Sequence, residues 1–228
     1  MINPISRIEI FHHKKIIASE ISKLQKAFYD DEEEYSNSED TRLYIKQFDA
    51  LQYEELTYAT FNKIISINHH EIETFTVKLS EHLKCIFQFI NSRKIFVLSH
   101  LKLDLFGNKS NKYAPLENAY QKLEKLVGCN SFSETLVFDI ENLQEIIEIL
   151  FWIIRCDPSV PEYISLFDEN EQLSIFLCKY GNIHLAEFNK EQLTNHQLEI
   201  LGWSIIEGQE TDNFSDNGKI IGRQLKVD

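Results

Sequence analysis

Cys178 and His184 are the residue types in this sequence that come closest to a reactive pair. They lie in two strand-like segments, roughly 172–180 and 182–188, joined at a glycine, so a hairpin would let them face each other with Glu187 nearby. A thiol activated by an oriented histidine is the arrangement of nucleophilic catalysis. A cysteine in an apolar strand is more often a core residue, however, because burial raises its pKa. We therefore predict no catalytic residue.

A second group of metal-capable residues is His69, His70, Glu71 and Glu73, with His82 about three turns further along the same expected helix. Two ligands on one helix face need a spacing of four residues, whereas adjacent histidines point to different faces. The group is typical of a polar helix start with acids in the first turn. We predict no metal site and no cofactor.

Other signatures of chemistry are missing from the sequence. It has no Gly-x-Ser-x-Gly motif and no glycine-rich phosphate loop, and its four cysteines lie 44, 27 and 22 residues apart, too far for a zinc knuckle or a redox dithiol. Met1 to Glu9 lacks the basic and apolar stretches of a secretion signal, and the longest apolar run, Ile149 to Ile154, is far too short to cross a bilayer. We expect a cytoplasmic protein without a membrane span.

The layout of charge is the strongest functional signal. The formal net charge is -13, and residues 30–40 hold seven acids and no base. Residues 114–228 carry 20 acids against eight bases, whereas residues 1–29 and 41–113 are each slightly basic. A polarised field of this kind steers oppositely charged partners and repels like-charged ones. It predicts a basic protein partner.

The candidate partner-binding surface consists of acids at turns and strand ends of the C-terminal half, together with three aromatic anchors. Complementary charge speeds encounter, and fixed aromatic side chains supply buried contact area. The predicted residues are Asp157, Glu162, Tyr163, Asp168, Glu169, Glu171, Tyr180, Glu187, Glu191 and Trp203. Acidity that only keeps the protein soluble is the alternative interpretation.

Two basic stretches are weaker signals. His12-His13 beside Lys14-Lys15 is typical of the solvated face of a helix. A second stretch is interleaved with aromatic residues, as in some nucleic-acid-binding surfaces, and contains Arg93, Lys94, Lys102, Lys109 and Lys112. Because the acidic remainder would repel phosphates, we predict no nucleic-acid partner.

The elements that must position these residues indicate an α+β fold. Apolar periodicity predicts helices over about 5–28, 41–66, 72–90 and 115–127, with an acidic loop at 30–40, and leaves 95–98 as strand or helix. After a short strand at 135–138, a central helix over 140–155 precedes an antiparallel meander of strands at 162–167, 172–180 and 182–188. A helix over 190–201, a strand at 203–206 and an edge strand near 219–221 complete the chain.

The expected organisation is a helical region over 1–112 followed by an α+β region over 113–228, with one continuous domain as the alternative. In overall character, being small, acidic and without catalytic motifs, the chain resembles the immunity proteins that bacteria keep against interbacterial toxins. The resemblance implies a non-enzymatic cytoplasmic protein whose carboxylates pair with toxin lysines and arginines while its meander covers the toxin's cleft.

Two alternatives stay open. One is an enzyme whose site is assembled from distant residues, such as His69, His70 and Glu73, or Cys178 and His184. The other is an adaptor or self-associating protein, in which the basic N-terminal helices face the acidic half of a neighbouring copy.

Overall fold

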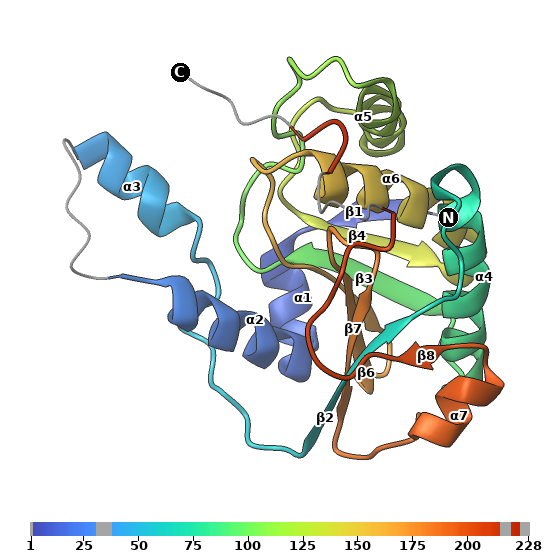
Figure 1. Cartoon of the computed structure of the whole chain (residues 1–228). Helices are drawn as coiled ribbons and strands as arrows, with labels where there is room; N and C mark the ends of the chain where they lie inside the picture. Colours follow the sequence, from blue (N-terminus) through green and yellow to red (C-terminus); the bar gives the residue numbers. More distant parts are fainter. Residues whose placement is uncertain (1, 31–37, 215–219, 224–228) are drawn as a thin grey trace.

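The computed structural model describes residues 2–30, 38–214 and 220–223 (Figure 1). The helices are α1 (Arg7–His13), α2 (Lys15–Phe28), α3 (Ser38–Lys46), α4 (Ile72–Phe89), α5 (Ala114–Val127), a short 3-10 turn (Ile140–Asn142), α6 (Leu143–Cys156) and α7 (Asn195–Ile200). The strands are β1 (Ile2–Ile5), β2 (Thr60–Ser66), β3 (Lys94–Ser99), β4 (Thr135–Asp139), β5 (Ile164–Asp168), β6 (Leu173–Leu177), β7 (Ile183–Phe188) and β8 (Ser204–Ile205).

All eight strands form one antiparallel sheet in the order β1-β4-β3-β5-β6-β7-β2-β8. The α+β class and the antiparallel sheet are thus confirmed, and β5, β6 and β7 form the expected meander. β1 and β3 pair with β4, so one sheet takes strands from both 1–112 and 113–228. The division into two domains stays a prediction.

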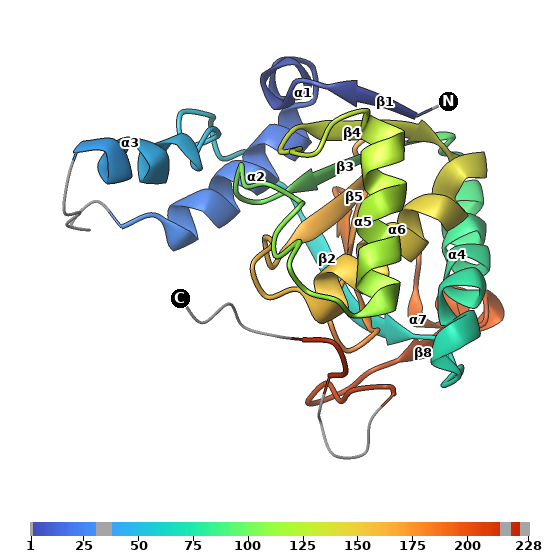
Figure 2. The same ribbon diagram turned by 90° about the horizontal axis from the view of Figure 1, so that it is seen from above.

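One face of the sheet is covered by a layer of helices (Figure 2). α6 packs against α4, α5 and β6, and its apolar side chains are buried on most sides, including Ile147, Leu150 and Ile153. Leu166 and Ile175 of the meander complete this main core. The broad apolar stripe of α6 therefore makes it the central helix that its periodicity predicts.

The opposite face is covered only in part, by α1 and α2. Phe11, Ile17 and Ile21 pack on Phe96 and Phe167, which the alternation of β3 and β5 directs away from the main core. Figure 2 shows α2 on the side of the sheet opposite to α5 and α6. Among the described residues, this second cluster reaches Phe188 of β7 but does not include Phe176 of β6 or His184 of β7, which line cavities on the same face.

A buried ion pair fixes α1 and α2 in this position. Arg7 is 0 % exposed, and its guanidinium donates two hydrogen bonds to Asp49, at 2.8 and 3.0 Å, and one to the Ser99 carbonyl, at 2.7 Å. Gln25 of α2 donates to the same Asp49 carboxylate and to the His100 carbonyl. The network thus links both helices to the end of β3.

The N-terminal elements differ from the prediction. Ile5 belongs to β1, and Lys14 adopts an extended conformation that divides the expected helix over 5–28 into α1 and α2. The expected helix over 41–66 ends at Lys46, and Thr60–Ser66 form β2, because this segment pairs with β7 along its length. Of the expected acidic loop, residues 31–37 lie outside the described residues, and residues 38–40 begin α3.

Elements with strong local signals are confirmed. α4 and α5 have the expected bounds to within a residue or two, Pro115 lies in the first turn of α5, and Gly128 ends it in the left-handed conformation at φ 72°. The ambiguous segment 95–98 lies in β3. Ile220 and Ile221 are not in a strand, and residue 219 of the expected edge strand lies outside the described residues. Among the described helices, none is long and apolar enough to cross a bilayer.

Candidate functional site

A groove crosses the part of the sheet face that α2 leaves open. It consists of two adjoining cavities of about 600 and 920 Å³, which share Ile64, Tyr163, Phe176, His184 and Gly208 in their linings. We call this feature the sheet-face groove. Its dimensions suit a peptide segment or a small molecule rather than an ion alone.

Aromatic rings form a row along the groove: Tyr163, Phe176 and His184 line both cavities, and Phe28 of α2, which lines neither, extends the row at one end. Phe28 of α2 contacts Tyr163, with ring centroids 5.8 Å apart, and Tyr163 contacts Phe176 at 5.2 Å. Phe176 in turn stacks on His184 at 4.1 Å, with the ring planes 11° apart. His100 packs between Phe28 and Tyr163, and burial lowers the pKa of its ring, which favours the neutral form. The row offers flat apolar area on an otherwise acidic protein.

The strand register explains how these side chains meet. In β6, Leu173, Ile175 and Leu177 point into the main core, so Phe176 points to the open face. The register pairs Phe176 with His184 of β7, which places both rings on that face. The alternation that fills the core therefore also builds the groove floor.

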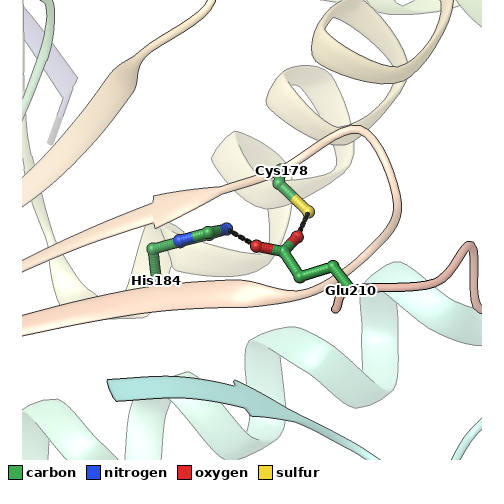
Figure 3. A group of neighbouring side chains, drawn as sticks. All are labelled: Cys178, His184 and Glu210. Atoms are coloured by element: carbon green, nitrogen blue, oxygen red, sulfur yellow. Dashed lines mark hydrogen bonds and ion pairs between the residues drawn. The ribbon is translucent and has the colours of Figure 1, made fainter. Parts of the chain in front are cut away.

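A polar trio lies at one end of the aromatic row (Figure 3). The Cys178 thiol donates to Glu210 Oε2 at 3.1 Å, and His184 Nε2 lies 2.7 Å from Glu210 Oε1. Burial, and then the neighbouring Glu210 carboxylate, raises the pKa of Cys178 to about 12. The thiol is therefore protonated at neutral pH and bonded to the carboxylate rather than to the histidine, so it lacks the activation that a thiol nucleophile requires.

This trio corrects one part of the sequence interpretation. Cys178 and His184 do lie on the same face of the hairpin, as diagonal neighbours. The nearby carboxylate is not Glu187, which is buried on the opposite face, accepts from the Leu193 amide and lies 3.8 Å from Lys63. Glu210 takes that place, from a segment after β8 in which no periodicity signals a role.

Four of the predicted partner-binding residues are interior. Asp157, Asp168, Glu187 and Trp203 are at most 2 % exposed. Asp157 accepts hydrogen bonds from the Tyr120 hydroxyl and the Asn108 amide, while Asp168 accepts from three amides of its own turn. These carboxylates satisfy buried donors. In this conformation the four side chains offer no surface to a partner.

Three further acids bind groups of the chain itself. Glu169 accepts from the amides of Arg93 and Lys94, and Glu171 accepts from two successive amides at the start of α2. Glu191 forms an ion pair with Lys63 at 2.7 Å. The expected acidic surface of the meander is therefore smaller than the sequence suggests.

The three remaining predicted residues line the groove, together with Asp157 and Glu191 from the two groups above. Glu162, Tyr163 and Tyr180 line the first cavity, and Tyr163 and Glu191 line the second. Sequence reasoning missed Phe28, Phe176 and Glu210. The alternation of β6 was a signal for Phe176, whereas Phe28 and Glu210 come from distant segments and had none.

The histidine group near the start of α4 does not converge. His69 Nε2 contacts the Thr74 hydroxyl, His70 Nδ1 contacts the Asn213 carbonyl, and the His82 ring packs on Trp203. In the part of the chain that the structure describes, Cys178, His184 and Glu210 are the group whose donor atoms approach closely enough to share an ion.

The polar trio and the aromatic row are thus the two candidate functional features of the groove. The chain matches no protein-family model, and comparison with curated proteins and with solved structures finds no match.

Proposed function

We propose that this chain is a protein-binding protein that receives a basic, extended segment of its partner in the sheet-face groove. The observation that carries the proposal is the aromatic row, in which Tyr163, Phe176 and His184 line the groove and Phe28 of α2 extends the row. Rigid aromatic rings provide large contact area at low entropic cost, and they attract lysine and arginine side chains through cation–π contacts.

The charges along the groove support a basic occupant. Glu20, Glu162 and Glu191 line its cavities, on a chain whose net charge is -13. Lys63, Lys179 and Arg223 also line the groove, so its acids, which include Asp157 and Glu210 as well, outnumber its bases by five to three. Two of these acids are paired with lysines, Glu20 with Lys23 at 2.8 Å and Glu191 with Lys63 at 2.7 Å. A negative field over an apolar floor speeds the encounter with a basic partner and disfavours acidic competitors.

The resemblance to immunity proteins against bacterial toxins extends the proposal to the identity of the partner and the role of the binding. The proposed partner is a toxin domain, and the chain acts on it in the cytoplasm without catalysis. Inhibition is steric because the bound segment belongs to the toxin's active cleft. The protonated thiol of Cys178 is in keeping with a site that binds rather than reacts.

Affinity capture from the native cell at low salt tests the proposal, with two variants of equal charge change. Glu162→Lys reverses a charge at the groove, and Glu124→Lys reverses an exposed charge on α5, on the other side of the sheet. We expect the wild type and Glu124→Lys to recover the same basic protein in stoichiometric amount, and Glu162→Lys to lose most of it.

Three results would contradict the proposal. They are equal recovery by both variants, recovery of no stoichiometric basic protein by the wild type, and recovery of only a second copy of this chain. The last result would favour the self-associating alternative.

A further inference from the structure

The donor atoms of the polar trio lie close enough together to share one metal ion. The Cys178 sulfur, a His184 ring nitrogen and a Glu210 carboxylate oxygen all lie within 4.8 Å of one another. In a tetrahedral zinc site, metal–ligand bonds of about 2.0–2.3 Å place the ligand atoms about 3.3–3.8 Å apart. Both contacts to Glu210, at 3.1 Å and 2.7 Å, are shorter than this spacing, so the Glu210 carboxylate must move outward when an ion binds.

We propose that Cys178, His184 and Glu210 bind a zinc ion. Sulfur, imidazole nitrogen and carboxylate oxygen are the three donor types that Zn²⁺ takes in proteins, whereas magnesium and calcium prefer oxygen alone. Three protein ligands leave one tetrahedral position open, and the trio lines the first cavity of the groove.

Neighbouring contacts hold the ligands in place. Stacking on Phe176 fixes the plane of the His184 ring, and the Cys178 amide donates to the Asn182 carbonyl at 2.9 Å, continuing the hairpin. The fully buried Asn182 side chain reaches Glu210 Oε2 at 3.5 Å and the Thr211 carbonyl at 3.3 Å. Outer contacts of this kind orient metal ligands and raise metal affinity.

The segment that carries Glu210 is also anchored beyond the ligand. Asp212 accepts two hydrogen bonds from the buried Arg155, at 3.1 and 3.2 Å, and the Asn213 amide donates to the Tyr180 carbonyl. On binding, the thiol proton passes to solvent, and the proton that His184 Nε2 donates to Glu210 moves to Nδ1 or to solvent. Bonds from zinc to sulfur, nitrogen and oxygen then replace the two hydrogen bonds within the trio.

Metal titration of the full chain tests the site without any partner. In one titration, zinc is added to the chelator-treated protein in competition with a coloured chelator, which reports the zinc affinity. In a second titration, cobalt replaces zinc as a spectroscopic probe. We expect one ion per chain and a sulfur-to-cobalt absorption band. Cys178→Ser and His184→Gln should each weaken zinc binding by about 100-fold or more, since even changes to outer contacts cost about 10- to 100-fold.

Cys129→Ser is the matched control, because Cys129 is an exposed cysteine outside the groove. It should keep both the zinc affinity and the cobalt band, while circular dichroism of each metal-free variant verifies its fold. Absence of stoichiometric zinc binding, or equal binding by wild type, Cys178→Ser and His184→Gln, would overturn the inference. Since no partner enters this titration, its outcome is separate from that of the capture experiment.

Discussion

Replacement of Arg7 by methionine should destabilise the protein strongly, because it leaves the Asp49 carboxylate buried with only part of its partners. The variant loses two hydrogen bonds to Asp49 and one to the Ser99 carbonyl. Gln25 Nε2 still donates to Asp49 at 3.0 Å. Since α2 contributes Glu20 and Leu24 to the groove lining, this network also supports the proposed binding site.

The expected loss in the free energy of unfolding follows from these contacts. Hydrogen bonds to charged groups contribute about 1.5–3 kcal/mol each, and burial of the methionine side chain recovers about 1.5–3 kcal/mol. The net loss is about 4 kcal/mol, within the range of about 3–5 kcal/mol that follows removal of one member of a buried ion pair. With a urea m-value of about 2–3 kcal/mol per M, the unfolding midpoint should fall by about 1.5–2 M.

Urea unfolding of the whole chain, followed by tryptophan fluorescence, measures this shift. Lys26→Met is the matched control, since Lys26 and Glu55 form an ion pair with the same 2.8 Å separation but with side chains 42 % and 46 % exposed. It should leave the midpoint unchanged, because solvent screens exposed pairs. The double variant Arg7→Met/Asp49→Leu should recover part of the loss. Equal midpoints for Arg7→Met and Lys26→Met would refute the reasoning.

Two further predictions concern buried groups. Asp168→Asn should cost about 1–3 kcal/mol at neutral pH in the same urea assay, because an amide group replaces a carboxylate oxygen that accepts from backbone amides. Burial raises the pKa of Asp168 despite those hydrogen bonds, so the pH-dependent part of its contribution to stability is complete below the unfolded value of about 3.9 and is lost as pH rises through the folded value. Asp168→Asn should therefore lack this part of the pH dependence, and an unchanged profile would contradict the assignment. Burial raises the pKa of Cys156 and Cys178 to about 12, so both thiols should react slowly with iodoacetamide. When the metal-free native protein is treated at pH 8, mass spectrometry should find adducts on the exposed Cys85 and Cys129 first. Early modification of Cys178 would show a reactive thiol instead.

Elements with complete local signals were predictable from the sequence. The apolar stripe of α4, the proline and glycine at the ends of α5, and the turn residues between the meander strands are local features, and each specified its element. The segment Thr60–Ser66 was not predictable in this way. Its helical spacing of apolar residues is overridden by pairing with β7, more than 100 residues later.

The candidate site shows the same division. The hairpin pattern indicated that Cys178 and His184 could face each other, although it predicted no site there, and Glu162 and Tyr163 were predicted as an acid and an aromatic anchor of the meander. Glu210 joins Cys178 and His184 through a tertiary contact that leaves no pattern in the sequence. Counting charge also overestimated the acidic surface, because a carboxylate at a turn, such as Asp168, can be an internal acceptor for buried amides.

Site-specific photo-crosslinking in the native cell tests directly whether a basic partner protein binds in the sheet-face groove. A photoreactive amino acid replaces Lys179, which lines the groove, or Lys125, which is exposed on α5 across the sheet. We expect an adduct with one basic protein from position 179, none from position 125, and loss of the adduct when Tyr163→Ala is added. Adducts of equal yield from both positions, or none from position 179, would contradict the proposal.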